Sequence, residues 1–469
     1  MTRKPDAPLL LPRLSLMMFL QFFAWGAWFV TLKVAFITND LGAFIGGAFE
    51  SAPIAAIFAP LFLGLVADRF FPSEKVMGVL LIIGSGIMAY IAHLAPQGAD
   101  QGPLIVKLMV AYMCCYMPTL GLGNTITFTH LPQEQFPKVR VWGTIGWIVA
   151  GLVIGFAGWS ASLKIFWLAS VSSLLVGVFC LSLPHTPAPA KGQPLNVRSL
   201  LMLDALALFK KPAFAVFAIC SMLICVPLAY YYGQTADYLT ATGFTESGST
   251  MTIGQMSEII FMLLIPFFFR RLGVKWMLLI GMLCWVARYA LFAFGASQQV
   301  TWMLLVGVAL HGICYDFFFV TGFIYTDKTA PKAIRGQAQS LLVFLTQGLG
   351  MFFGFRFAFG GTFPFTTAKL PNTASVGGDV IGNPPAGDLV NAITEASSEV
   401  VEKSTLEQLG GMFGKGYPDG LDASLVASNM EAWKQYWMFP MLMAAAIALI
   451  FFLTFWDRAA DPEKSSSAE

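Results

Sequence analysis

A carboxylate and an amide lie close together inside a long apolar run, Gly254-Gln255-Met256-Ser257-Glu258. On a helix, side chains three residues apart share a face, so Gln255 and Glu258 offer donors and acceptors to a hydroxylated solute from one side. A carboxyl group in apolar surroundings can also bind and release a proton, because desolvation disfavours its charged form. The structural alternative is an interhelical ion pair between Glu258 and Arg288.

A second group of polar side chains interrupts the apolar run around residue 313. His311 and Tyr315 are four residues apart and share a helical face, while Asp316 is turned to one side. We expect Asp316 to take part in proton coupling or ligand contact. The alternative is a hydrogen-bonded network with a purely structural role, which is also the commoner role for a single histidine.

A third pattern combines a cation, a hydroxyl and an indole at helical spacing. Arg140, Thr144 and Trp147 form one stripe, in which the first two can donate to ligand oxygens and the indole can stack on a flat ring. Arg140 has a second explanation, since it also lies where cytoplasmic cations are expected. Gln21 and Trp25, with Trp28, form a comparable stripe that is more typical of helix packing.

The elements that carry these residues must be membrane helices. Of the 469 residues 57% are hydrophobic and 12% charged, and the mean hydropathy is +0.70. A soluble domain has about twice that share of charge, and disordered, coiled-coil and nucleic-acid-binding chains are excluded by the same figures. The seven cysteines show no CxxC spacing, so we expect neither a metal site nor a disulfide framework.

Twelve apolar stretches are each long enough to span a bilayer, which requires about 20 residues. They lie near 14–37, 48–70, 76–95, 104–130, 141–160, 162–184, 213–239, 250–270, 275–297, 301–326, 335–363 and 435–457. Long apolar runs exclude a membrane β-barrel, whose strands alternate in polarity. The first stretch lacks a small-residue cleavage site, so we interpret the N-terminus as a tail and not a signal peptide.

The sequence therefore predicts an all-α polytopic membrane protein with two six-helix bundles. The expected parts are an N-terminal tail (1–13), a first bundle (14–184), a connector (185–212), a second bundle (213–457) with a loop insertion at about 364–434, and a C-terminal tail (458–469). Of the 28 lysines and arginines, 19 fall in tails, loops and helix ends on the side of the termini. The positive-inside rule then places both termini in the cytoplasm. The long loop has two interpretations, an insertion without a role in the chemistry or a lid.

Charged residues recur at equivalent positions in the two predicted bundles. Asp68 and Arg69 follow the second stretch, and Arg270 and Arg271 follow the eighth. Such charges cap helix C-termini and can pair across the halves, so we expect a cytoplasmic gate here. Positive-inside topology alone would account for the arginines but not for Asp68.

The segment Gly64–Arg69 resembles the loop signature of the major facilitator superfamily, in abbreviated form. Other segments resemble its nucleoside–proton symporter branch, in order through both halves. They are Phe19–Trp28, Tyr116–Thr125, Arg140–Trp147, Gln255–Glu258, Arg288–Gly295, Tyr315–Phe318 and Ile334–Gln339. The long outer loop has no counterpart in the resemblance.

The resemblance implies a set of substrate-binding and proton-coupling residues. Substrate contacts fall on Arg140, Thr144, Trp147, Gln255, Glu258, His311 and Tyr315, and proton coupling on Glu258 and Asp316. The chain departs from the family pattern in the seventh stretch, where Ala229 and Tyr232 replace an amide-bearing pair. In the tenth stretch, His311 and Tyr315 stand where the family has Tyr and Phe. Tyr230, Tyr231, Tyr232 and Gln234 are candidates for substitute contacts.

These observations favour a secondary transporter that carries a nucleoside with a proton across the bacterial inner membrane by alternating access. The proton gradient would supply the energy without a cofactor, and no Walker A loop indicates ATP hydrolysis. We expect a monomer in the lipid bilayer with no nucleic-acid partner. The alternatives are a symporter for a sugar, oligosaccharide, amino acid or drug and, remotely, a membrane enzyme or sensor. An enzyme is disfavoured because the four histidines are scattered.

Overall fold

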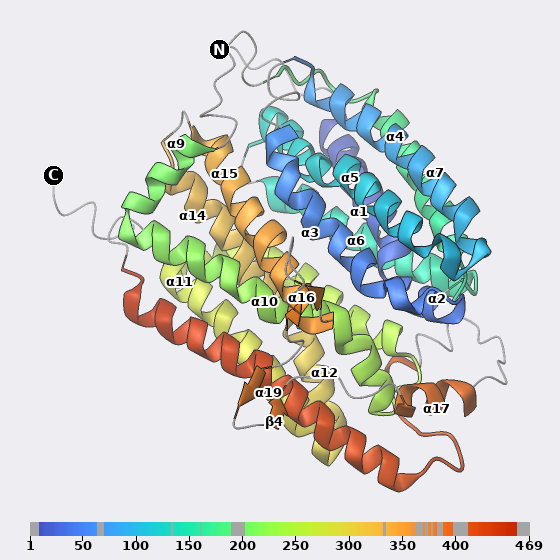
Figure 1. The fold of residues 1–469 in the computed structure, drawn as a ribbon. Helices are drawn as coiled ribbons and strands as arrows, with labels where there is room; N and C mark the ends of the chain where they lie inside the picture. The colour runs from blue at the N-terminus through green and yellow to red at the C-terminus, as the bar shows by residue number, and fades with distance from the viewer. Residues whose placement is uncertain are drawn as a thin grey trace. The chain divides into compact units, whose positions relative to one another are not determined.

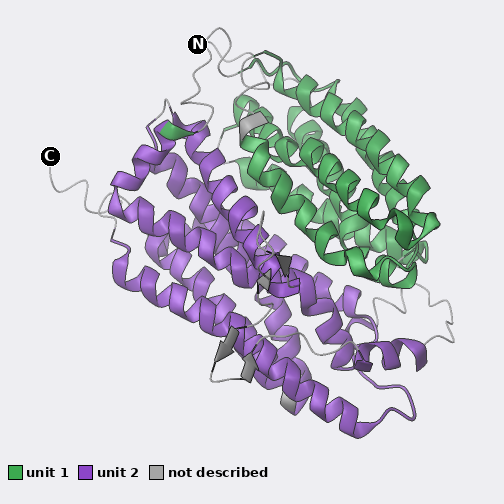
Figure 2. Cartoon of the chain, in the orientation of Figure 1, with its two compact units in different colours: residues 1–203 green, residues 204–469 purple. Residues whose placement is uncertain are grey.

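The chain folds into helices that form two compact units, residues 1–203 and 204–469 (Figure 1 and Figure 2). The computed structural model describes residues 9–62, 70–132, 135–159, 161–188, 202–331, 334–359, 388–396 and 411–456, with four short strands between 361 and 381. The boundary between the units lies within the connector expected at 185–212.

Unit 1 is built from long apolar helices. They are α1 (Leu10–Phe29), α2 (Leu32–Thr38), α3 (Ile45–Phe62), α4 (Ser73–Leu94), α5 (Gly102–His130), α6 (Phe136–Phe156) and α7 (Lys164–Cys180). Helix α1 packs against α6 and α7, α4 packs against α5 and α7, and α3 packs against α5. Proline in the first turn of α5 and α6 helps to start these helices, since its φ angle is fixed near the helical value.

Unit 2 contains one very long helix, α11, of 52 residues. Its main helices are α10 (Pro212–Ala241), α11 (Ser247–Gln298), α12 (Thr301–Ala309), α13 (His311–Tyr315), α14 (Thr321–Thr329), α15 (Arg335–Val343), α16 (Met351–Phe359) and α19 (Ala423–Thr454). The π-helical stretches Asp316–Val320 and Phe344–Gly350 join α13 to α14 and α15 to α16. Helix α11 packs against α12, α13 and α19, and α10 packs against α16 and α19. Short turns, α9 (Leu203–Leu206) and Ala207–Lys210, precede α10.

The described helices account for twelve membrane crossings. Ten helical segments are long and apolar enough to cross a membrane. In this count α1 with α2, α12 with its continuation, and α15 with α16 are one segment each. One of the ten, Ser247–Ala296, has 50 residues, which at about 1.5 Å per residue is far longer than a bilayer core of about 30 Å. It contains a non-helical break at Gly273 and therefore represents two crossings. The shorter helix α7 is the twelfth.

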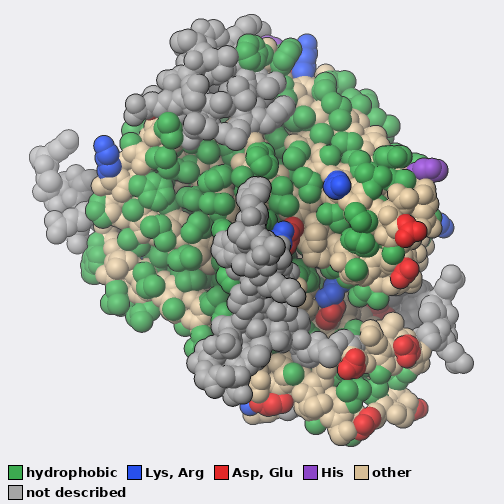
Figure 3. Space-filling view, viewed as in Figure 1, with side chains coloured by type: hydrophobic (Ala, Val, Ile, Leu, Met, Phe, Trp, Pro, Cys, Tyr) green, Lys and Arg blue, Asp and Glu red, His purple; other side chains and the backbone are tan. Residues whose placement is uncertain are grey.

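The surface has the polarity of a protein in lipid. Large apolar side chains are exposed along the helices, including Phe58, Trp167 and Leu175 in unit 1 and Ile260 and Leu453 in unit 2. In Figure 3, apolar side chains cover much of the visible surface of the described residues, and charged side chains are sparse. Glu258, Arg288 and Asp316 are buried instead, which reverses the arrangement of a soluble domain.

The insertion expected at 364–434 contains secondary structure and ends earlier than expected. Strand β1 (Gly361–Thr362) pairs with β2 (Lys369–Leu370), β3 (Ala374–Val376) pairs with β4 (Asp379–Ile381), and α17 (Asp388–Ala396) follows. The last helix begins at Ala423 and not near 435, because the Asp422 side chain caps it by accepting the Ser424 N–H at 2.8 Å. The first turns of α19 are polar, so hydropathy alone does not distinguish them from the preceding loop.

The chain after α7 is bound back onto the start of α4. The Glu74 side chain, which is buried, accepts the backbone N–H of Thr186 at 3.0 Å and lies 3.3 Å from His185 Nδ1. The Ser73 N–H donates to the Thr186 carbonyl at 3.0 Å, and His130 Nε2 lies 3.0 Å from the Thr186 hydroxyl. The connector therefore leaves unit 1 from a fixed point.

Candidate functional site

The first predicted pair of site residues lies in the first half of α11. Glu258 is buried, with 7% of its surface exposed, and Gln255 is half-buried one turn earlier. The Gln255 Oε1 atom is buried and accepts no hydrogen bond from the described residues. Glu258 lies within electrostatic range of Tyr231 and Tyr232 on α10. These two polar residues of α11 are thus placed beside the aromatic part of α10.

The second predicted group packs directly onto the first. Gly312 approaches α11 so closely that an added Cβ would lie 2.4 Å from the Ser257 carbonyl carbon, and its N–H donates to Ser257 Oγ at 2.9 Å. This contact brings His311 beside Ser257 and Glu258. His311 and Asp316 are buried, and the rings of His311 and Tyr315 are 5.7 Å apart, as expected for a shared face.

Asp316 begins the π-helical stretch Asp316–Val320. The sequence spacing predicted an ordinary α-helix here. A π-helical turn adds a residue to the helical repeat and often occurs at functional positions. It changes the direction in which side chains after Asp316 point relative to His311 and Tyr315.

Aromatic rings and a buried cation complete this group of residues in unit 2. The Tyr231 ring is stacked on the His311 ring, with centroids 5.0 Å apart and planes at 16°. The Arg288 guanidinium carbon lies 4.1 Å from the centroid of the same Tyr231 ring. Tyr232 packs edge-on against His311 at 5.9 Å. We call Tyr231, Gln255, Glu258, Arg288, His311, Tyr315 and Asp316 the buried polar cluster.

Arg288, considered above as an ion-pair partner of Glu258, is fully buried and donates from Nη2 to Cys314 Sγ at 2.8 Å. Its Nε and Nη1 atoms have no hydrogen-bond partner among the described residues. Sequence reasoning did not single out Cys314. The only available signal was its position three residues after His311, on the same side of the helix.

The stripe on α6 is held against α1 in unit 1. The Arg140 guanidinium carbon lies 4.2 Å from the Phe22 ring centroid, and Trp147 packs edge-to-face on Trp25 at 5.4 Å and 83°. Thr144 is buried between these two positions of the stripe. The Arg140 Nη1 atom is buried without a hydrogen-bond partner among the described residues, so it has a free donor.

Gln21 has a structural role in the described conformation. Its Nε2 donates to Thr119 Oγ1 at 2.9 Å, and its backbone carbonyl accepts the Tyr116 hydroxyl at 2.7 Å. These bonds join α1 to α5 next to the stripe. Trp25 also contacts Tyr116, at 5.5 Å between centroids.

The predicted gate is only partly described. Asp68 and Arg69 lie outside the described residues. Arg270 and Arg271 are exposed, and the Arg271 guanidinium carbon lies 4.4 Å from the Phe267 ring centroid. They precede Gly273, where the direction of α11 changes.

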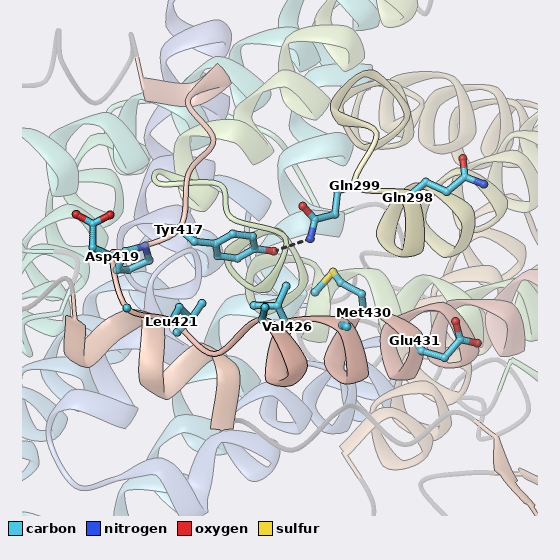
Figure 4. Close-up of a pocket in the computed structure, with 12 residues that line it drawn as sticks. Gln298, Gln299, Tyr417, Asp419, Leu421, Val426, Met430 and Glu431 are labelled. Carbon is cyan, nitrogen blue, oxygen red and sulfur yellow. Dashed lines mark hydrogen bonds between the residues drawn. The ribbon is translucent and has the colours of Figure 1, made fainter.

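A separate pocket lies at the end of unit 2 where α11 stops and α19 begins (Figure 4). Its volume is about 710 Å³, and it contains none of the predicted site residues. Gln299 Nε2 donates to the Tyr417 hydroxyl at 3.4 Å, and that hydroxyl donates to the Ala241 carbonyl at 2.9 Å. Burial raises the pKa of Tyr417 to about 12, so its hydroxyl remains protonated at neutral pH.

Comparison with known proteins identifies a family and several similar proteins. A family model described as "Nucleoside H+ symporter" matches residues 10–368. The putative nucleoside transporter YegT of Escherichia coli K12 is 41% identical over 356 residues, covering 73% of this chain and 82% of that protein. The nucleoside permease NupG of the same organism is 35% identical over 361 residues, covering 73% and 85%. The crystal structure of NupG superposes with a TM-score of 0.65 at 27% identity, covering 96% and 100%.

Proposed function

The chain belongs to the nucleoside H+ symporter family, with the fold of the major facilitator superfamily, and we propose that it imports nucleosides with protons across the bacterial inner membrane. The family consists of membrane transporters, so we propose that the chain has no enzymatic activity. The energy source would be the proton gradient, without a cofactor, and the working unit a monomer in lipid.

The observation that carries the proposal, beside the family itself, is the buried polar cluster. A charged group in the interior of a membrane helix bundle costs several kcal/mol and is seldom kept without a function. The cluster contains the carboxylates of Glu258 and Asp316 and the guanidinium of Arg288. They lie among tyrosines and a histidine. This composition suits a solute that has both hydroxyl groups and a flat ring.

We assign different parts of the substrate to different side chains. Gln255 and Glu258 would bind hydroxyl groups, with His311 and Tyr315 beside them. Arg140 and Thr144 would donate to ligand oxygens, and Trp147 would stack on the base. By the resemblance, Ala229 and Tyr232 stand where the family has an amide-bearing pair, so the contacts to the base would differ from those of the family.

Proton coupling would use Glu258 or Asp316. Binding of a proton removes the charge of a carboxylate, which lowers the cost of moving the loaded site through a water-excluded state. Release of the proton on the other side restores the charge and resets the carrier. Arg270 and Arg271, with Asp68 and Arg69, would hold the cytoplasmic gate.

Uptake of labelled uridine and adenosine by cells that lack their own nucleoside carriers tests this function. We expect accumulation of at least one nucleoside that a protonophore abolishes. Excess maltose should not compete. Confirmed expression without uptake of either nucleoside, or protonophore-sensitive uptake of a disaccharide instead, would contradict the proposal.

A further inference from the structure

Among the buried tyrosines of unit 2, the hydroxyl groups of Tyr230, Tyr231 and Tyr436 have no hydrogen-bond partner among the described residues, whereas those of Tyr238 and Tyr289 do. Tyr238 donates to the Phe292 carbonyl and Tyr289 to the Pro227 carbonyl, each at 2.5 Å. The Tyr231 hydroxyl is equally buried but has no hydrogen-bond partner among the described residues. A buried hydroxyl without a partner is destabilising, and it calls for an explanation when it lies beside a candidate site.

The surroundings of this hydroxyl belong to the buried polar cluster. An added Cβ at Gly254 would lie 3.3 Å from Tyr231 Oη and 3.0 Å from His311 Cβ, so the hydroxyl lies against the backbone of α11 one residue before Gln255. The Gln255 Oε1 atom is also without a hydrogen-bond partner among the described residues. Glu258 is within electrostatic range of the same hydroxyl.

The position of the ring is fixed by its neighbours. His311 stacks on it and the Arg288 guanidinium lies over it, so the ring cannot turn freely to find another partner for its hydroxyl. Tyr230, the preceding residue, provides a contrast. Its hydroxyl is also buried without a partner, but its ring packs against Tyr436 and Phe439 of α19, away from the cluster.

We propose that the Tyr231 hydroxyl donates a hydrogen bond to a ribose hydroxyl group of the transported nucleoside. This inference rests on the proposed function and adds a specificity-determining residue to it. A ribose hydroxyl both donates and accepts, so it can accept from Tyr231 while it donates to Gln255 Oε1 or the Glu258 carboxylate. The hydroxyl is buried in the described conformation, so the contact requires a conformation in which Tyr231 Oη is accessible next to Gly254.

Tyr231→Phe tests the assignment because it removes only the hydroxyl. Tyr436→Phe is the matched control, because the Tyr436 hydroxyl on α19 is also buried without a partner among the described residues. For each variant, KM and the maximal rate of uridine uptake are measured in cells, and the melting temperature is measured on purified protein. The inhibition constants of 2′-, 3′- and 5′-deoxyuridine are determined in the same uptake assay.

We expect Tyr231→Phe to raise KM for uridine about three- to tenfold, the effect of one neutral hydrogen bond, without lowering the melting temperature. Tyr436→Phe should leave KM unchanged. One of the three deoxyuridines lacks the ribose hydroxyl that Tyr231 binds. That compound should have the same inhibition constant for wild type and for Tyr231→Phe.

Three results would overturn the inference alone. They are an unchanged KM for Tyr231→Phe, the same rise in KM for Tyr436→Phe, or equal weakening of inhibition by all three deoxyuridines in Tyr231→Phe. Absence of nucleoside uptake by the wild-type protein would instead contradict the proposed function, and the inference with it.

Discussion

Glu258 and Asp316 are carboxylates in the interior of the same helical unit, each on a different crossing. Glu258 lies on α11 next to Gln255, and Asp316 lies where the helix widens into a π-helical turn. Arg288 brings a positive charge into the same region, over the Tyr231 ring. A proton that binds one carboxylate therefore changes the net charge of the whole cluster, which is the property that proton-coupled transport requires.

Glu258→Gln should abolish concentrative uptake. Glutamine keeps the size and hydrogen-bonding oxygen of the side chain but can neither bind nor release a proton at neutral pH. We expect uptake by this variant to stop at the level that wild type reaches with a protonophore. Glu431→Gln is the control, because Glu431 is exposed on α19 and pairs with Lys434. Normal accumulation by Glu258→Gln would remove Glu258 from the coupling mechanism.

Helical spacing predicted part of this cluster correctly. His311 and Tyr315 were expected on one face, and their rings are in contact. Spacing did not predict that Tyr231 stacks on His311 or that Cys314 accepts from Arg288. Those contacts join separate helices, and local periodicity contains no information about which face of one helix meets which face of another.

The Asp422 carboxylate gives one residue-level effect outside the membrane. The N–H and hydroxyl groups of Ser424 donate to it, which lowers its pKa below the ordinary value of about 3.8. The ionised form therefore stabilises the start of α19 above that value, and the stabilisation is lost as the pH falls through the lowered pKa.

We accordingly expect the amides in the first turn of α19 to exchange with solvent faster as the pH is lowered below about 4, after correction for intrinsic exchange. Asp422→Asn should remove this pH dependence while it retains a capping oxygen. Hydrogen-exchange mass spectrometry of the peptide that starts at Asp422 measures both. An identical pH response of the two proteins would show that the carboxylate does not stabilise the cap.

At the level of elements, α11 depends on one backbone position. Gly273 has φ 67° and ψ 179°, which separates the helical segments 247–272 and 274–298. A side chain at such an angle is strained whatever space surrounds it, and the space around Gly273 is open. The turn between two crossings therefore rests on the conformation of Gly273 and not on packing around it.

Gly273→Ala should destabilise the protein by about 1–3 kcal/mol, the usual cost of forcing such a conformation on another residue. Gly248→Ala in the first turn of the same helix is the matched control. Its φ is helical and its surroundings are also open, so alanine should be neutral or slightly stabilising. Thermal unfolding of the purified variants measures the difference. Equal melting temperatures would show that the turn does not need glycine.

Glu74 determines where the connector leaves unit 1. Glu74→Ala removes the acceptor for the Thr186 N–H and should accelerate exchange of that amide about 10- to 100-fold, the equivalent of one charge-assisted hydrogen bond. Glu74→Gln retains an acceptor oxygen and should restore most of the protection. Peptide-resolved hydrogen exchange over 181–188 distinguishes the two variants. Unchanged exchange in Glu74→Ala would mean that the backbone pairing with Ser73 is sufficient.

For the whole molecule, composition and apolar run length were enough to predict a helical membrane protein with twelve crossings. They did not predict the start of α19, because its first turns are polar and its cap depends on Asp422. They also did not predict the two π-helical stretches, because the length of an apolar run does not depend on helical pitch. Hydropathy measures the affinity of a segment for lipid, so segments that leave the bilayer or change helical pitch are poorly predicted by it.

Twelve crossings would place both termini on the same side of the membrane, and the distribution of 19 of 28 cations predicts that this side is the cytoplasm. Green fluorescent protein folds in the cytoplasm, and alkaline phosphatase is active only in the periplasm. We expect fluorescence from fusions at either terminus and phosphatase activity from an insertion at Gly420, which precedes α19. Fluorescence from a fusion at one terminus only would indicate an odd number of crossings. Active phosphatase in fusions at both termini would indicate the opposite orientation. Active phosphatase at both termini would also move the proposed gate residues Arg270 and Arg271 out of the cytoplasm.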